Sequence, residues 1–345
     1  MRILFLGGFL RGYRLLRRLV ERGESVVGAF VFEEDPHEET RFAERIAALA
    51  EQHGIPVELT RRLGKRRAAE IAERSRPDVI FCLGWRTMLP EELLELAPGG
   101  VVAAHDSLLP RLRGFAPTNW ALLLGHDRVG VTLFRLTPGV DEGDVYFQQA
   151  VPVTPQDTLA GLVEQIADAS VGLFERYLDA AREGTLAAHP QEHAHATYTC
   201  SRTPQDGEID WSAPTDAIVR EVRALAPPAP GAYTYFDGRI LRVLSAWAVE
   251  TPPCYEGRIP GRVVARDAVG GTVDILSGDG VVRVETVLLE GGDGEPQAPA
   301  ELIRSVRAHL GLRPAWEIAR LHQTIAALRE QIEQLERQLR SAGVS

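Results

Sequence analysis

The stretch VVAAHDSLLPRLRGFAPTNW, residues 101–120, decides the fold of the first half of the chain. A run of small apolar residues ends in His105, a loop with proline and arginine follows, and a helix comes next. Upstream, short apolar runs alternate with amphipathic stretches, which predicts strands at 2–6, 26–32, 57–59, 78–83 and 101–105 and helices at 11–21, 41–53 and 65–75. This alternation indicates right-handed βαβ crossovers, and therefore an α/β domain with a Rossmann-like parallel sheet.

Two of the predicted strands end in residues that suit a binding site. In open parallel sheets, ligands bind beyond the carboxyl ends of the strands. Residues 83–86 and 105–107 both follow directly on such ends. The glycines in GGF at 7–9 lack the G-x-G-x-x-G spacing, so they predict a tight strand-to-helix turn in preference to a dinucleotide loop.

The second half of the chain changes character twice. Strands at 129–136 and 145–151 and a long helix at 158–183 are predicted first. A polar stretch with His189, His193 and His195 follows, which we interpret as a linker and not as a metal site. Short strands separated by Gly/Asp turns then predict a small β-barrel or sandwich, OB-like in type. These strands are expected at 233–236, 240–246, 261–264, 271–277 and 281–289.

The tail is a third unit, and Pro314 marks the start of its helix. Apolar residues recur there at alternating spacings of three and four: Ile318, Leu321, Ile325, Leu328, Ile332, Leu335 and Leu339. Ile at a and Leu at d favour a parallel two-stranded coiled coil, so we expect a homodimer through 315–340. A helix packed on its own domain is the alternative. The predicted domains are thus 1–196, 197–312 and 313–345.

Composition limits the classes of partner. The 345-residue chain is 45% hydrophobic and carries a formal net charge of −10, which disfavours nucleic acid. Its three cysteines, Cys82, Cys200 and Cys254, are far apart, so we expect a reducing compartment without disulfides or a metal cluster. The N-terminus reads as a strand and no segment reaches membrane-spanning length, which predicts a cytoplasmic protein with no membrane partner.

Three longer stretches together resemble the folate-dependent formyltransferase family, which includes methionyl-tRNA formyltransferase and the nucleotide-sugar N-formyltransferases. They are HDSLLPRLRGFAPTNWALLLG at 105–125, GVTLFRLTPGVDEGDVY at 130–146 and SRTPQDGEIDWSAPTDAIVREVRALAPPAPGAYTYFDGR at 201–239. Their order and spacing are similar to the family's over about 1–312, and the tail lies outside it. Taken alone, His105 is compatible with a core histidine and Asp141 with a turn aspartate.

The resemblance implies transfer of a formyl group from N10-formyltetrahydrofolate to a primary amine. His105 and Asp141 take the places of the family's catalytic histidine and aspartate. In that role His105 polarises the formyl oxygen, and Asp141 orients the ring or accepts the amine proton. The segments that match the family's pterin contacts supply the expected cofactor-binding residues Leu83, Gly84, Trp85, Arg86, Gly139 and Asp144.

One position departs from the family pattern. The family's Asn-x-His asparagine falls on Ala103, whose methyl group cannot donate a hydrogen bond. Removing one oxyanion donor costs roughly 10²–10³ in rate. Either another donor replaces it, with Ser107 as our candidate catalytic residue and Asp106, Asn119 or an ordered water as others, or the chemistry has weakened or changed.

The acceptor amine is inferred from charge. Residues 207–312 hold 10 arginines and no lysine against 15 Asp and Glu, a net charge of −5, and FEEDPHEET at 32–40 is acidic; both argue against tRNA. A nucleotide-linked amino sugar is the first choice, with Arg111, Arg113 and Asn119 as substrate-binding candidates. Arg111 and Arg113 are equally compatible with a solvated loop. The alternatives are a carrier-tethered amine in natural-product assembly, or a folate-binding or scaffolding protein with a disabled site.

Overall fold

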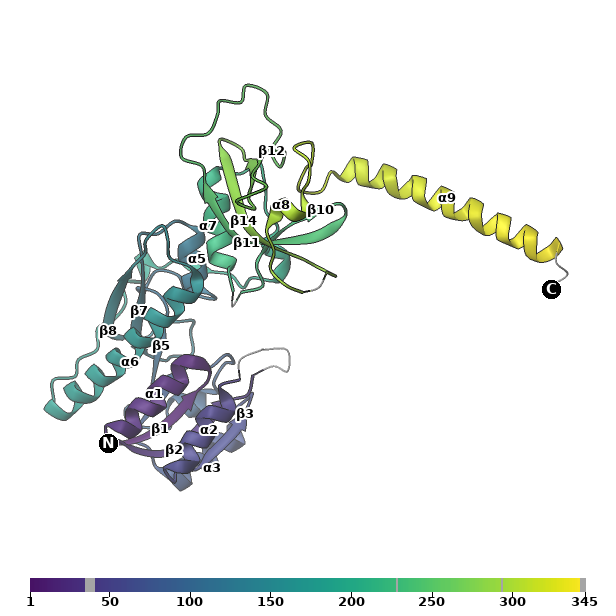
Figure 1. Cartoon of the computed structure of the whole chain (residues 1–345). Helices are drawn as coiled ribbons and strands as arrows, with labels where there is room; N and C mark the ends of the chain where they lie inside the picture. The colour runs from purple at the N-terminus through teal and green to yellow at the C-terminus, as the bar shows by residue number, and fades with distance from the viewer. Residues whose placement is uncertain (35–40, 228, 293, 342–345) are drawn as a thin grey trace. The chain divides into compact units, whose positions relative to one another are not determined.

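A computed structural model describes residues 1–341 apart from 35–40, 228 and 293, and describes the backbone alone at 68, 69, 72, 73, 315–317, 336 and 339–341. The chain divides into two compact units (Figure 1). The first comprises Met1–Asp206 with Arg223–Pro230, and the second Gly207–Val222 with Gly231–Ser345. The segment after 196, predicted to open the second domain, stays in the first unit because strand β9 (Tyr198–Thr199) pairs with β6 (Arg113–Gly114).

A seven-stranded sheet of order β3-β2-β1-β4-β5-β7-β8 forms the first unit. Its strands are β1 Arg2–Gly7, β2 Ser25–Phe32, β3 Val57–Thr60, β4 Val79–Leu83, β5 Val101–His105, β7 Arg128–Arg135 and β8 Val145–Pro152. The five strands up to β5 are parallel, as predicted. Strands β7 and β8 are antiparallel, so the sheet is mixed. The cause is that the loop after His105 turns back at the carboxyl end of β5, from where β7 runs in the opposite direction.

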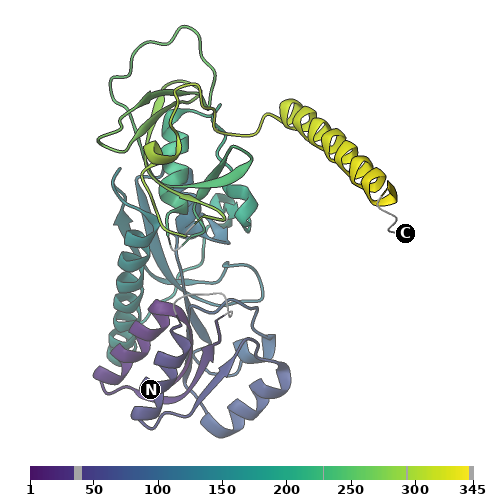
Figure 2. The same ribbon diagram turned by 45° about the vertical axis from the view of Figure 1, so that its right-hand side comes forward.

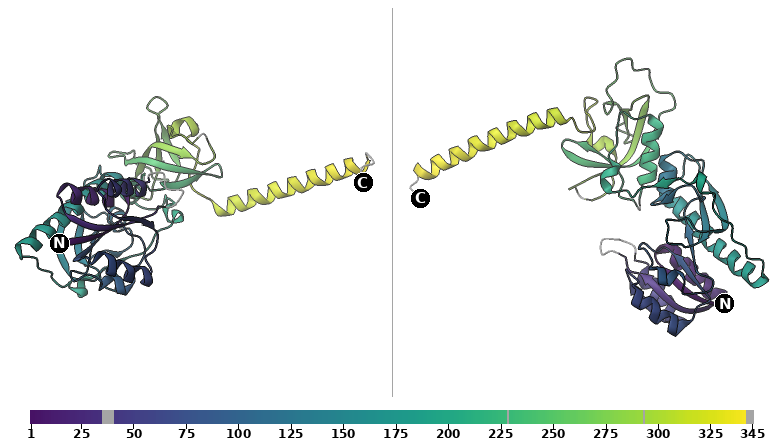
Figure 3. Two further views of the ribbon diagram at one scale, coloured as in Figure 1. Left: turned by 90° about the horizontal axis from the view of Figure 1, so that it is seen from below. Right: turned by 180° about the vertical axis from the view of Figure 1, so that it is seen from behind.

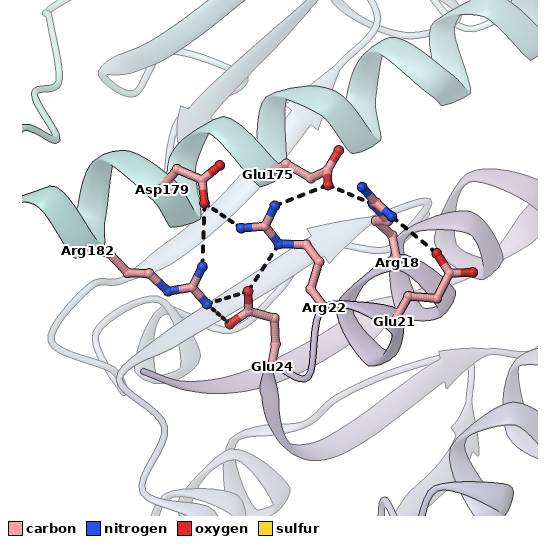
Figure 4. A network of polar contacts seen from close by, with 7 residues as sticks. All are labelled: Arg18, Glu21, Arg22, Glu24, Glu175, Asp179 and Arg182. Atoms are coloured by element: carbon pink, nitrogen blue, oxygen red, sulfur yellow. Dashed lines mark hydrogen bonds and ion pairs between the residues drawn. The ribbon is translucent and has the colours of Figure 1, made fainter.

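Side chains alternate between the two faces of the sheet and build a core on each. Phe5, Phe81 and Val102 pack with residues of helices α1, α2 and α6, whereas Leu6, Cys82 and Ala103 pack with residues of α3 and α4. The helices are α1 Phe9–Glu21, α2 Ala43–Gln52, α3 Lys65–Ser75, α4 Glu91–Leu94, α5 Pro117–Leu123 and α6 Leu159–Glu183. Helices α1 and α6 lie side by side (Figure 2), joined by ion pairs (Figure 4).

The second unit contains a five-stranded antiparallel sheet of order β10-β11-β14-β13-β12. Its elements are β10 Ala232–Phe236, β11 Arg239–Ala248, β12 Val263–Arg266, β13 Val273–Leu276, β14 Val281–Leu289, α8 Pro299–Leu302 and α7 Thr215–Leu225, the last crossing into the first unit. All five strands were predicted from their turns. Among the described residues no ladder joins β10 to β12, so the predicted OB-like barrel closure stays a prediction.

Helix α9, Pro314–Ser341, begins at the predicted proline and is continuous (Figure 3). Six of its seven heptad residues, from Ile318 to Leu335, are 45–58% exposed, and the side chain of Leu339 lies outside the described residues. The acidic stretch at 35–40 lies outside them too. No helix in the described part of the chain is both long enough and apolar enough to cross a membrane.

Candidate functional site

The last residue of β5 is the centre of the site. His105 lies opposite Thr132 of β7, and its Nε2 is 2.8 Å from the carbonyl oxygen of Leu112. Because a carbonyl only accepts, Nε2 is the protonated nitrogen and donates to it. The other ring nitrogen, Nδ1, lies 3.5 Å from Oδ2 of Asp141. The structure therefore brings the two predicted catalytic residues together.

Asp141 is held by strand β6, and His105 by the residue just before that strand. It lies in the loop between β7 and β8 with a left-handed φ of 50°. Its Oδ2 accepts a hydrogen bond from the Gly114 backbone N–H at 2.8 Å. The short strand β6 and the residue before it thus contact both partners: Leu112 anchors the ring and Gly114 anchors the carboxylate.

This arrangement places two proton acceptors side by side. When Nδ1 of His105 carries no proton, it presents a lone pair to the Asp141 carboxylate. The two side chains are largely buried, with 10% and 19% of their surfaces exposed. A proton released between them finds an acceptor on either side, and the resulting imidazolium lies next to a negative charge. The pair is suited to taking a proton from a nucleophile.

Ala103 leaves the position of the missing asparagine apolar. It lies opposite Cys82 of β4 and Phe134 of β7, and it is buried with both of them in the same core cluster. Burial raises the pKa of the Cys82 thiol to about 12, so the thiol stays neutral and is only a weak donor.

The side chains that we considered as replacements for that asparagine are engaged elsewhere. Ser107 is buried and its hydroxyl donates to the Arg111 carbonyl at 2.6 Å, which stabilises the loop after β5. Asp106 forms an ion pair with Arg11. Asn119 is buried and its amide donates to the Ala224 carbonyl. These contacts favour a structural role for Ser107 and Asn119 over the catalytic and substrate-binding roles that we predicted.

The two arginines expected to contact substrate differ in exposure. Arg113 is only 1% exposed and its guanidinium donates to Gln191 and Tyr198, so it is not presented to a substrate diphosphate. Arg111 is exposed and lines a cleft of about 450 Å³ that also contains His126. Burial, and then the nearby charge of Arg111, lowers the pKa of His126.

Four of the residues predicted to contact a pterin, Leu83 to Arg86, lie at an aromatic cluster. Phe32 packs between Phe9 and Trp85, with ring centroids 5.9 and 5.5 Å away, and the Arg86 guanidinium lies over Phe9. Leu83 is buried at the end of β4. Gly84 has a φ of 79° and lies so close to Gly8 that a Cβ there would be 2.4 Å from the Gly8 oxygen. Strand β1 ends at Gly7 and α1 begins at Phe9, which confirms the predicted tight strand-to-helix turn at 7–9.

Two buried polar atoms near these segments lack a partner among the described residues. They are Nε1 of Trp85 and Oγ1 of Thr137. Gly139 and Asp144 bracket the loop that carries Asp141, and the Asp144 carbonyl accepts from the Arg135 N–H. Aromatic surface with unpaired donors fits a flat, polar heterocycle such as a pterin.

Sequence patterns missed Gln191, which lies in the stretch interpreted as a linker. Its side chain bonds Arg113 and the carbonyls of Asp141 and Gly143. These partners lie 78, 50 and 48 residues away in sequence, so no local motif reveals them.

Comparison with known proteins identifies the family of the chain. The family model described as formyl transferase matches residues 1–178, and the model of the formyl transferase C-terminal domain matches residues 202–306. A HypX structure from Aquifex aeolicus, in complex with tetrahydrofolic acid, is similar with a TM-score of 0.61 and 22% identity over 88% of this chain. The chain spans about half of HypX, 46% of its length.

Smaller sugar-modifying proteins are also similar. An N-formyltransferase from Helicobacter canadensis, bound to folinic acid and dTDP-3-aminofucose, matches with a TM-score of 0.59 and 15% identity over 82% of this chain and 98% of its own. The sugar 3N-formyl transferase WlaRD has a TM-score of 0.59 and 14% identity over 84% of this chain and 98% of its own. Two family models, in order and over most of the sequence, confirm the predicted resemblance: the chain belongs to the formyl transferase family.

Proposed function

We propose that this chain is a folate-dependent N-formyltransferase whose acceptor is the primary amine of a nucleotide-linked amino sugar. The observation that carries the proposal is the His105–Asp141 pair, held by Leu112 and Gly114 in a formyl transferase domain. N10-formyltetrahydrofolate supplies the formyl group whose carbon the amine attacks. The aromatic cluster of Phe9, Phe32 and Trp85, with the unpaired Trp85 Nε1, would hold its pterin.

The residues of the chain then accept the proton of the amine and stabilise the negative charge that develops on the formyl oxygen. An amine that attacks a carbonyl carbon loses a proton, and Nδ1 of His105 beside Oδ2 of Asp141 accepts it. Once protonated, the ring donates from Nδ1 toward the negative charge on the formyl oxygen. When the bond between the formyl carbon and N10 breaks, Nδ1 gives its proton to N10, so that tetrahydrofolate leaves, the formamide remains on the acceptor and the ring is neutral again. Asp141 stabilises that imidazolium, and the Leu112 carbonyl keeps the ring from rotating.

Charge and relatives support the sugar acceptor. The net charge of −5 over residues 207–312 does not suit tRNA. Two similar structures contain dTDP or a dTDP-linked amino sugar. On this chain the exposed Arg111, which lines the 450 Å³ cleft, is a cation available for a diphosphate.

A turnover assay with N10-formyltetrahydrofolate and a panel of UDP- and dTDP-linked amino sugars tests the proposal. The matched variants are His105→Asn and Asp141→Asn, because asparagine at 141 keeps an acceptor for the Gly114 N–H but removes the charge. We expect formylated product from the wild type and a loss of about 10²-fold or more in both variants. Turnover that survives both substitutions would contradict the proposal.

Ala103 favours a second candidate, a folate-binding protein that no longer turns over. Its methyl group removes a donor from the reaction centre while leaving the aromatic cluster intact. Calorimetry with 5-formyltetrahydrofolate separates the two: micromolar binding without product from any amine supports this second candidate, and no binding argues against both. A carrier-tethered amine is tested by supplying the same amine on a carrier protein.

We also propose that α9 pairs in parallel with α9 of a second chain. Six seam residues are half exposed along a helix of otherwise polar surface, and that apolar surface is covered when two copies meet. The identical seams place Ile against Ile and Leu against Leu in register, which is the core composition that two-stranded coils favour.

A further inference from the structure

Gln191 occupies a buried position between strand β6 and the loop from β7 to β8 that carries Asp141. It lies in the segment between α6 and β9 and is 7% exposed. Its Oε1 accepts two hydrogen bonds from Arg113, at 2.6 Å from one terminal nitrogen and 3.2 Å from Nε. Arg113 belongs to β6, and the next residue of that strand, Gly114, donates its backbone N–H to the Asp141 carboxylate.

The nitrogen of the same amide binds the loop that carries Asp141, residues 141–143. Nε2 of Gln191 donates to the carbonyls of Asp141, at 2.8 Å, and Gly143, at 2.7 Å. The orientation of the amide is unambiguous, because a guanidinium only donates and carbonyls only accept. Gln191 therefore spans from β6 to the backbone of the residue whose left-handed φ presents the carboxylate to His105.

The choice of an amide at this position is informative. Arg113 is almost fully buried, and the partners found for it are neutral: Gln191, Tyr198 and His193. A buried guanidinium is best paired with a carboxylate. Glutamate would provide one at 191, but it would have no hydrogen to donate to the carbonyls of Asp141 and Gly143. The amide thus keeps the donor end, and among the described residues no carboxylate is paired with Arg113.

We infer that Gln191 is the positioning residue for Asp141 in the reaction. It acts through the backbone of the 141–143 loop and touches no reacting atom. The inference rests on the proposed formyl transfer, although the placement of Asp141 is measurable without turnover. The Gly114 N–H, whose hydrogen bond goes to the Asp141 carboxylate, reports that placement directly.

The variant Gln191→Glu distinguishes the two ends of the Gln191 side chain, the oxygen bound to Arg113 and the nitrogen bound to the 141–143 loop; we call these bonds together the Gln191 clamp. It retains the acceptor for Arg113 and adds the missing charge, but it loses both bonds to the loop. We expect its thermal midpoint to stay near the wild-type value. Its kcat should fall by on the order of 10²-fold, because a shift of about 1 Å in a catalytic group has that effect. KM for the folate donor should change less than kcat.

Two further variants bracket this result. Gln191→Leu loses both ends: Arg113 keeps Tyr198 and His193 but loses its bonds to residue 191, and two carbonyls lose a donor. Both its thermal midpoint and its kcat should therefore fall. Tyr198→Phe removes one bond to Arg113 but leaves the clamp intact, so its kcat should match the wild type. In Gln191→Glu, the Gly114 amide should exchange with solvent deuterium faster by NMR, while in Tyr198→Phe it should not.

Either of two results overturns the inference. One is a Gln191→Glu protein whose kcat or Gly114 exchange stays at the wild-type value. The other is a Gln191→Glu protein as unstable as Gln191→Leu, because Gln191 would then serve stability alone. If the wild type turns over no substrate, the proposed function fails, and the Gly114 exchange rate decides the positioning role by itself.

Discussion

His105 is held at one nitrogen and free to change protonation at the other. The Leu112 carbonyl fixes Nε2–H, so any proton taken up goes to Nδ1, beside Asp141. A single backbone contact therefore determines the tautomer. Two residues earlier on the same strand, Ala103 offers no donor, and the buried Cys82 thiol next to it does not compensate.

The first prediction concerns Ala103→Asn. If the rest of the site is competent, an added amide donor should raise kcat by about 10²-fold. The matched control is Ala103→Leu, which adds a side chain of similar size without a donor to the same apolar cluster. Steady-state kinetics on the amino-sugar panel measure both. Equal rates in the two variants, or a gain in the leucine variant, would show that the missing donor is not what limits the reaction.

At the scale of single residues, patterns identified the reacting groups but not their supports. His105 and Asp141 were identified because each lies in a stretch with a family-like pattern. Arg113 was expected to meet a substrate diphosphate from the loop after His105, and Asn119 to contact substrate from the helix that follows. Both are buried by segments distant in sequence, the 191–198 segment and Ala224, and burial of this kind has no local signal.

At the scale of elements, α1 and α6 are joined by a network of seven charged residues (Figure 4). Glu24 is its least exposed member, with a side chain 4% exposed. It accepts from Arg22 at 3.2 Å and from Arg182. Arg22 also pairs with Glu175 and Asp179, and Arg182 also pairs with Asp179. Each of the two arginines therefore keeps a carboxylate partner if Glu24 is lost.

The second prediction is that Glu24→Gln lowers the free energy of unfolding by about 1–2 kcal/mol. Removing a buried carboxylate from its cations costs more than removing an exposed one, and the remaining carboxylates limit the loss. Glu21→Gln, on an exposed pair with Arg17 and Arg18, is the control and should cost less than about 0.5 kcal/mol. Urea unfolding compares them, and equal losses would mean that burial of Glu24 is irrelevant.

The third prediction concerns the start of α7. Asp279 accepts from the backbone N–H and the hydroxyl of Thr215, both at 2.8 Å. These bonds, the backbone one first, lower the pKa of Asp279. The carboxylate therefore contributes its full stabilisation above the unfolded pKa of about 3.9, and that contribution is lost as pH falls through the lower folded pKa.

Asp279→Ala should accordingly cost about 1 kcal/mol at pH 7, as the loss of a helix cap does. The difference from wild type should shrink at pH values below the folded pKa, where both proteins lack the charge. Asp279→Asn, which keeps an oxygen acceptor, should lose less at pH 7. Urea titrations at neutral and acidic pH measure this, and a deficit that does not change with pH would rule out the charged cap.

Elements were more predictable than the contacts between them. Short apolar runs and turn residues predicted the longer strands of both units, and amphipathic stretches predicted most helices of the first unit, whereas helix α7 was not predicted. The reversal of β7 was not evident, because the turn-back of the loop after His105 depends on tertiary bonds such as Thr132 to Ser107. The strand β6 has two residues, too few to carry a pattern.

At the scale of the molecule, the sequence of α9 predicts how the helix pairs but not which chain it pairs with. The heptad spacing predicts the seam, and the seam is exposed in the single chain. Its e and g positions, such as His322, Thr324, Arg329 and Gln331, offer few charge pairs. Periodicity therefore specifies how the helix pairs, and charge does little to specify with which chain.

The fourth prediction is that truncation after Arg313 converts a dimer into a monomer, measured by light scattering on a sizing column. A seam variant, Leu328→Asp, should do the same, whereas Ala327→Asp one residue away should leave the dimer intact. Turnover per chain with a free nucleotide sugar should stay within about twofold, because His105 and Asp141 lie in the other unit. A full-length protein that is monomeric would contradict the proposed pairing of α9. Loss of activity on truncation would favour the carrier-tethered amine as the acceptor.

The pairing of β6 with β9 also sets the order of events during synthesis. A nascent chain that has reached Glu183 contains every strand of the seven-stranded sheet, along with His105 and Asp141. It does not yet contain Gln191, nor the Tyr198–Thr199 strand beside Arg113–Gly114. The sheet can thus assemble while the ribosome is still translating, but the reaction centre acquires its final shape only once the segment through Thr199 has emerged.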